Sequence, residues 1–205
     1  MDYTALASNE AVTKTADALK ERNFEAIVVD TKEEALEKIK TLIPEGVSVM
    51  NGASRTLEEI GYVEYLKSGT HGWNNLHAAI LAEKDPIKQA ELRKHSVLSD
   101  YYLGSVHSLS QTGEMVISSN SGSQLPHLAY TSPNIILVVG TQKITPTLQE
   151  ALRRMEEHVV PFEDERMKKA YGYGTMEAKT LILRSENPVL GRKVRVILVK
   201  EKLGF

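Results

Sequence analysis

Short apolar runs alternate along the chain with segments in which apolar residues recur every three to four positions. Strands are expected at 24–30, 47–50 and 134–140, and amphipathic helices at 8–22, 31–43 and 145–159. The run NIILVVG at 134–140 is apolar almost throughout, which is typical of a parallel strand covered on both faces. The alternation predicts an α/β fold in which helices flank a mostly parallel, twisted sheet.

The other segments give weaker patterns. Residues 62–99 contain helical stretches interrupted by glycine and proline, which indicates a candidate helical cap. Residues 101–120 predict a β-hairpin or two adjacent strands around the turn QTGE. Residues 160–179 predict irregular structure, whereas 180–184 and 193–205 predict a closing pair of strands. Because no linker or internal repeat divides the sequence, residues 1–205 are expected to form one domain.

Composition narrows the chemistry. The 205 residues include 25 Lys plus Arg against 27 Asp plus Glu, a balance that does not indicate a nucleic-acid-binding surface. No apolar run approaches the ~20 residues that a membrane helix needs, and the N-terminus does not resemble a secretory signal, so a cytoplasmic location without membrane insertion is expected. The chain has no cysteine, which excludes thiolate nucleophiles and iron–sulfur clusters ligated by its own thiolates. Redox chemistry would therefore belong to a partner or a borrowed organic cofactor, and no cofactor bound by this chain itself is expected.

Three loops follow predicted elements at 51–56, 118–124 and 140–146, and each is built from glycine with hydroxyl or amide residues. In an open parallel sheet, ligands bind beyond the carboxyl ends of the strands. A helix that begins there presents free N–H groups and about half a positive charge, which favours phosphate or carboxylate. The loops therefore predict a crevice for a small anion.

The loop at 51–56 has two interpretations. Thr56 and Glu59 have the spacing of a capping box, which would explain the threonine by helix capping alone. Gly52, Ser54 and Arg55 are left for a ligand, since a guanidinium can bind a carboxylate through two hydrogen bonds. Thr56 stands where a serine-hydrolase elbow would need glycine, which disfavours that class.

The loop at 118–124 contains no acid or base. Ser119, Asn120, Gly122 and Ser123 could bind a ligand through hydroxyl, amide and backbone groups, or they could form a plain polar turn. Acid–base catalysis needs a titrating group, so this loop alone cannot supply it.

Two titrating residues are weak catalytic candidates. Lys143 follows the most apolar strand and could reach an anion in the crevice, or it could be an exposed loop lysine. Asp100 could orient a hydroxyl group or belong to a turn. His71 and His77 are six positions apart and do not share one helical turn, so no metal site is expected. The charged runs at 153–157 and 165–169 are expected to be solvated helix faces.

Several blocks resemble the LUD-domain family, which includes lactate utilization protein C. They are NGASRTLEEIG, SDYYLGSVHSLSQTGEMVISSNSGSQLP, NIILVVGTQKITPTLQEALRRMEEHVVP and VRVILVKEKLGF. The resemblance implies the fold shared by ribose-5-phosphate isomerase, glucosamine-6-phosphate deaminase and the CoA transferases. It also implies a role in bacterial oxidation of L-lactate beside separate iron–sulfur oxidoreductase subunits, so that iron–sulfur clusters would be available only through a partner.

The sequence departs from the catalytic motifs of those fold relatives. Where the CoA transferases carry a catalytic glutamate, the comparable stretch 119–122 has Asn120, which cannot form the acyl anhydride. The acidic run and the lysine-glycine loop of the sugar-phosphate isomerases are also missing.

Three functions stay open at this point. The first is an accessory or regulatory subunit of a lactate-oxidising system that binds a small carboxylate or phosphorylated anion. The second is an independent enzyme acting on a sugar phosphate, with Asp100 and Lys143 as acid–base groups. The third is a non-catalytic scaffold, and homo-oligomerisation is left open in each case.

Overall fold

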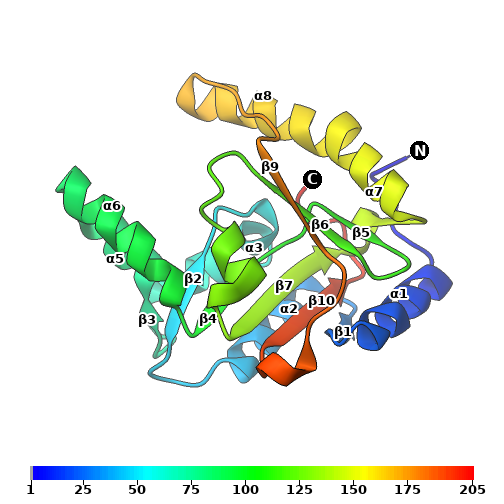
Figure 1. Ribbon diagram of the computed structural model, residues 1–205, viewed down its shortest axis with the longest axis horizontal. Helices are drawn as coiled ribbons and strands as arrows, with labels where there is room; N and C mark the ends of the chain where they lie inside the picture. The colour runs from blue at the N-terminus through cyan, green and yellow to red at the C-terminus, as the bar shows by residue number, and fades with distance from the viewer. Residues whose placement is uncertain (1) are drawn as a thin grey trace.

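A six-stranded sheet, parallel throughout, is the centre of the computed structural model, which describes residues 2–205 (Figure 1). Its strand order is β1-β10-β7-β4-β2-β3. The bounds are β1 Glu25–Val29, β2 Ser48–Asn51, β3 Asn74–Asn75, β4 Tyr101–Gly104, β7 Asn134–Gly140 and β10 Lys193–Val199. The predicted α/β fold with a mostly parallel sheet is confirmed.

Helices begin and end largely where side-chain caps allow. Ser8 caps α1 and Thr31 caps α2, each accepting from a backbone N–H three residues on. The α-helices are α1 Asn9–Glu21, α2 Lys32–Leu42, α3 Arg55–Glu59, α4 Tyr62–Ser68, α5 Leu76–Ala82, α6 Pro86–His95, α7 Leu148–Arg154 and α8 Val160–Tyr171. Two π-helical turns, η2 His127–Thr131 and η4 Met155–Val159, and three 3₁₀ turns, η1 Ser96–Leu98, η3 Thr141–Lys143 and η5 Pro188–Leu190, complete the set.

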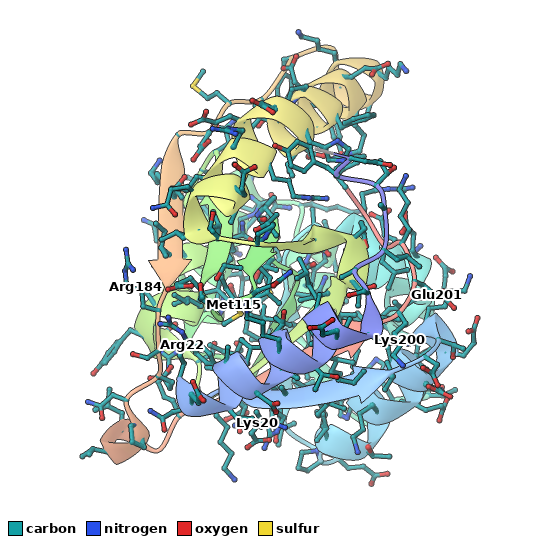
Figure 2. All side chains as sticks on the ribbon, turned by 90° about the vertical axis from the view of Figure 1, so that its right-hand side faces the viewer. Lys20, Arg22, Met115, Arg184, Lys200 and Glu201 are labelled. Atoms are coloured by element: carbon teal, nitrogen blue, oxygen red, sulfur yellow. The ribbon has the colours of Figure 1, made fainter. Side chains whose placement is uncertain are left out.

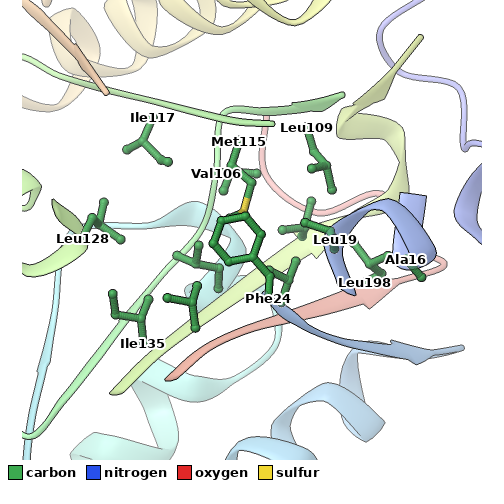
Figure 3. Packing of buried hydrophobic residues seen from close by; sticks show 14 of the residues in the cluster. Ala16, Leu19, Phe24, Val106, Leu109, Met115, Ile117, Leu128, Ile135 and Leu198 are labelled. Carbon is green, nitrogen blue, oxygen red and sulfur yellow. The ribbon is translucent and has the colours of Figure 1, made fainter. Parts of the chain in front are cut away.

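Successive residues of a strand point to opposite faces of the sheet. In β7 the residues on both faces are buried, each set in a different hydrophobic cluster. Ile135 and Leu137 of β7 face a cluster that includes Leu19 of α1 and Met115 of the second sheet (Figure 3). Ile136 and Val138 of the same strand face the cluster that contains residues of α2, α3 and α4. The continuous apolar run at 134–140 is thus explained by cover on both sides.

A second, four-stranded sheet packs on the α1 side with the order β8-β5-β6-β9. Its strands are β5 Ser108–Ser110, β6 Met115–Ser119, β8 Ile144–Thr145 and β9 Lys179–Leu183. Arg22, at the end of α1, joins it to the first layer: the guanidinium donates to the Arg184 carbonyl at 2.7 Å and pairs with Glu114 at 2.7 Å (Figure 2). The cluster of Figure 3 fills the space between the two sheets.

Two sequence predictions about the last third of the chain are wrong. Residues 160–171, expected to be irregular apart from the charged helix face at 165–169, form helix α8, in which i,i+3 and i,i+4 ion pairs such as Arg166–Glu163 and Lys168–Asp164 support the helical spacing. The expected closing pair of strands does not pair: β9 lies beside β6, whereas β10 lies between β1 and β7. Their similar apolar character did not reveal that they belong to different sheets.

The segments at 62–99 and 101–120 match their predictions in part. Helices α4, α5 and α6 occur within 62–99, but β3 also adds an edge strand beside β2. No residue of α6 is buried. The hairpin around QTGE is formed by β5 and β6, whereas the stretch at 101–104 is β4 of the parallel sheet.

Candidate functional site

A cavity of about 780 Å³ opens at the carboxyl ends of β2 and β4, between the parallel sheet, the end of β6 and the helix α8. Its polar floor comes from three loops and one side chain: residues 52–56 after β2, 104–107 after β4, 118–121 at the end of β6, and Lys143 after β7. Residues of η4 and α8, the stretch after α8 and Phe205 form the opposite wall. The predicted crevice is therefore present, although one of its loops belongs to the second sheet.

Lys143 lies at the centre of the floor. Its Nζ donates hydrogen bonds to Thr56 Oγ1 at 3.0 Å, Ser105 Oγ at 3.1 Å and the Val106 carbonyl at 3.2 Å. All three acceptors are uncharged, and the residue is only 4% exposed. Burial and the nearby Arg154 charge lower the pKa of Lys143 to about 7. Lys143 therefore lines the cavity as a buried residue and is not an exposed loop lysine, whereas its contact with an anion stays a prediction.

His107 is a site residue that the sequence analysis missed. Its Nδ1 accepts the backbone N–H of Ser118 at 3.1 Å, which leaves the ring proton on Nε2 in the neutral form. Burial, with Lys143 and Arg154 nearby, lowers the pKa of His107 to about 3, so the ring stays neutral at physiological pH. His107 lines the cavity as a neutral imidazole. Its position in a predicted hairpin carried no signal of this role.

Arg154 corrects the expectation that residues 153–157 form a solvated helix face. The residue is fully buried, and its guanidinium donates to the His107 carbonyl at 2.5 Å and to the Tyr3 carbonyl at 3.4 Å. Both acceptors are uncharged, so the arginine adds positive potential behind the floor. The neighbouring Arg153 is exposed, as expected.

The capping interpretation of Thr56 and Glu59 is wrong. Ser54 is the cap of α3: its Oγ accepts the N–H of Leu57 at 3.3 Å. This frees Thr56 to accept from Lys143, and Glu59 accepts the N–H of Gly204 at 2.7 Å instead. A Cβ at Gly204 would lie 2.6 Å from Thr56 Oγ1, so this close approach of the backbone requires glycine.

Other predicted residues of the first loop lie at the cavity as well. Gly52, Ser54 and Arg55 line it, and a Cβ at Gly52 would lie 2.9 Å from the hydroxyl of Tyr102. Arg55 is half-exposed at the rim and pairs with Glu58 at 2.7 Å and Glu59 at 3.5 Å. Its charge is therefore partly compensated within α3.

The second loop is divided. Ser119 and Asn120 line the cavity, whereas Gly122 and Ser123 do not. The Ser119 hydroxyl accepts the N–H of Gly122 at 2.9 Å, and Gly122 has φ +86°, so these two residues form a polar turn. Ser119 therefore both lines the cavity and closes the turn, and ligand contact by this loop stays a prediction.

Asp100 does not belong to the site. Its carboxylate accepts from Ser48 N at 2.8 Å and Ser48 Oγ at 2.6 Å, and these bonds hold the pKa of Asp100 below its usual value. Both residues lie where β2 and β4 begin, whereas the cavity lies where these strands end. Asp100 lies at the N-terminal ends of the parallel strands and Lys143 lies beyond their C-terminal ends. The two residues therefore cannot act as an acid–base pair.

The charges around the cavity favour an anion. Four cationic side chains line it (Arg55, Arg93, Lys143 and Arg166), against two carboxylates (Glu58 and Glu163). The carboxylates pair with Arg55 and Arg166 at the rim, so Lys143 is left with uncharged partners. A concave site lined by one excess sign of charge concentrates ligands of the opposite sign.

Comparison with known proteins assigns the chain to a family. The profile of the LUD domain matches residues 12–180. The chain belongs to the LUD-domain family. The crystal structure of a DUF162 family protein from Deinococcus radiodurans is similar, with a TM-score of 0.57, 16% sequence identity, and coverage of 95% of this chain and 99% of that chain. At this identity the likeness shows a common fold.

Other comparisons add less. Ribose 5-phosphate isomerase A from Neisseria gonorrhoeae overlaps with a TM-score of 0.37 and 14% identity over 78% of each chain, which is too small an overlap to argue from. No curated protein sequence matches the chain significantly. Within residues 2–205, no group of three or more metal-ligating side chains comes together. None of the helices in this same range has the length and apolar character needed to span a bilayer.

Proposed function

We propose that this LUD-domain chain is an accessory or regulatory subunit of a bacterial lactate-oxidising system, located in the cytoplasm, and that its cavity binds a small carboxylate or phosphorylated anion. The subunit role rests on the family, whose members the sequence resemblance links to L-lactate oxidation beside iron–sulfur subunits. The anion rests on one observation: Lys143 lies buried in the cavity floor with three uncharged acceptors.

The electrostatic argument is one of compensation. A buried ammonium group loses its hydration, and the nearby hydroxyl and carbonyl dipoles replace only part of the lost stabilisation. The pKa of Lys143 therefore falls to about 7. An anion that entered the cavity would stabilise the protonated form directly. The hydroxyls of the floor and the N–H of neutral His107 would supply further hydrogen bonds to its oxygens.

Binding is tested by calorimetric titration with lactate, pyruvate, ribose 5-phosphate and inorganic phosphate. At least one of these anions should bind the native chain, and Lys143→Met should abolish or strongly weaken that binding. Lys193→Met is the matched control, because Lys193 is exposed at the N-terminal end of β10, whereas the cavity lies at the C-terminal ends of the strands. Equal affinity in Lys143→Met and the native chain would refute the site.

The subunit role is tested by quantitative affinity purification of the tagged chain from cells grown on lactate. An iron–sulfur oxidoreductase recovered in fixed ratio would support the proposal. Recovery of the chain alone would contradict it and favour an independent function.

A second function, an independent enzyme acting on a sugar phosphate, is favoured by one observation. A general base works best when its pKa lies near the working pH, and Lys143 meets that condition. Asp100 is removed from this scheme, so Lys143 would have to act with neutral His107. Turnover of ribose 5-phosphate by the purified chain, lost in Lys143→Met and retained in Lys193→Met, would establish it.

A further inference from the structure

The cavity wall opposite Lys143 differs from the floor in chemistry. Apolar and aromatic side chains from η4, α8 and the stretch after it line this wall: Met155, Val159, Val160, Met167, Tyr171 and Tyr173. Met176 also contributes, so three of the six methionines in the chain face one cavity. Methionine is flexible and polarizable, and its contacts with aromatic rings are favourable.

Helix α8 explains why these side chains are available. Val160, Glu163, Met167 and Tyr171 line the cavity and follow one another at spacings of three or four residues, so they occupy one face of the helix. No residue of α8 is buried. Val160 also packs against the buried cluster of Val116, Ala151, Met155 and Val159, so the part of this face left for the cavity is Met167 and Tyr171.

The size of the cavity gives an independent argument. Pockets of roughly 300–1,000 Å³ take drug-sized ligands and bury most of their surface. At about 780 Å³, this cavity is much larger than a lactate or pyruvate molecule. A three-carbon acid bound to Lys143 would leave the wall of α8 without a partner.

We propose that the ligand is an elongated organic anion, with a phosphate or carboxylate at the Lys143 floor and an aromatic ring system against the Met167–Tyr171 wall. This inference rests on the proposed anion site and names the class of ligand that the site takes. Lys143 in the floor matches the anionic end, and the methionine and tyrosine side chains match a flat apolar body.

The test is a calorimetric titration of the full chain with inorganic phosphate, phenyl phosphate and 1-naphthyl phosphate, which share the anionic group and differ in ring area. We expect the dissociation constant to fall by about tenfold with the first ring, because burial of a phenyl-sized group contributes on the order of that factor. A further fall is expected with the second ring.

Variants locate the ring. Met167→Gln keeps the length of the side chain and should weaken 1-naphthyl phosphate while leaving inorganic phosphate unchanged. Leu190→Gln is the control, because Leu190 is exposed on η5 and does not line the cavity. Retained folding of each variant is checked by its melting curve.

The outcomes separate the two proposals. If phosphate binds through Lys143 but the rings add nothing, the inference about the ligand class is wrong and the anion site stands. If the rings help equally in Met167→Gln and the native chain, they lie elsewhere and the inference is also overturned. If none of the three phosphates binds, the inference about the ligand class fails, and the titrations with lactate and pyruvate decide whether the anion site stands.

Discussion

The floor and the α8 wall of the cavity are built in opposite ways. The floor is fixed by strands of the parallel sheet, which are buried on both faces, and its central side chain makes three hydrogen bonds. The wall combines α8, which has no buried residue, with buried Met155 and Val159 of η4, and it presents methionine and tyrosine to the cavity. In the proposed site, charge recognition would thus lie on a rigid scaffold, whereas contact with the rest of the ligand would fall to an adaptable surface.

The largest effect is expected on the free energy of unfolding, which should depend more on the strands below the floor than on the helix of the wall. Leu137→Ala in β7 removes a fully buried side chain and should lower the free energy of unfolding by about 2–5 kcal/mol. Met167→Ala in α8 should lower it by less than ~1 kcal/mol, because the site is partly exposed. Urea denaturation of both variants measures the difference, and similar losses would contradict the contrast between floor and wall.

The next effect concerns anion affinity. Lys143→Met removes a charged donor from the floor, and hydrogen bonds to charged groups contribute about 1.5–3 kcal/mol. Anion affinity should therefore fall by about 10- to 100-fold. Calorimetry with phenyl phosphate measures the affinity, and Lys193→Met is the control. A loss of less than about threefold is what an exposed charge causes and would contradict a role of Lys143 as the main anion-binding group.

The pH dependence follows from the same lysine. Above pH 7 the folded chain loses the Lys143 charge, so anion affinity should fall as pH rises, by at most about tenfold per pH unit. Because the pKa of Lys143 in the folded chain lies below the ordinary lysine value of 10.5, the unfolded chain binds more protons between about pH 7 and pH 10.5. The contribution of Lys143 to stability should therefore increase from about pH 7 to pH 10.5, and Lys143→Met should show neither trend.

The smallest effect is expected at the rim. Arg55 is half-exposed and paired with Glu58 and Glu59, so Arg55→Gln should change the free energy of unfolding by about 0.5 kcal/mol or less. Anion affinity should fall only a few-fold, because exposed charges are screened by salt. Titrations at low and high salt check this, and a loss as large as that of Lys143→Met would move the anion from the floor to the rim.

Particular residues show how far the sequence could be used. The run at 134–140 predicted a covered parallel strand because its composition reflects burial on both faces. The loop after β2 was recognised from glycine and hydroxyl residues, but the capping residue was misplaced by two positions, since Ser54 and Thr56 are equally good caps. Local spacing does not indicate which of the two hydroxyls accepts a hydrogen bond from Lys143, which is distant in sequence.

Other features depended on tertiary structure alone. Asp100 and Lys143 are both adjacent to strands, and only the direction of those strands separates them. The roles proposed for His107 and Arg154 depend on tertiary contacts, since the guanidinium of buried Arg154 donates to the His107 carbonyl, and no sequence pattern marks them. The sequence indicates a helix face only at 165–169 of α8, because Glu163 interrupts the apolar spacing of Val160, Met167 and Tyr171.

The most direct test of the anion site is proton uptake on binding. Pyruvate and phenyl phosphate are titrated into the native chain at pH 8 in two buffers with different ionisation enthalpies, and the same titrations are repeated with Lys143→Met. Because a bound anion stabilises the charged form of a lysine whose pKa is about 7, we predict uptake of a proton by the native chain that is lost in the variant. Binding without uptake, or uptake that persists in Lys143→Met, would contradict the assignment of Lys143 as the anion-binding group.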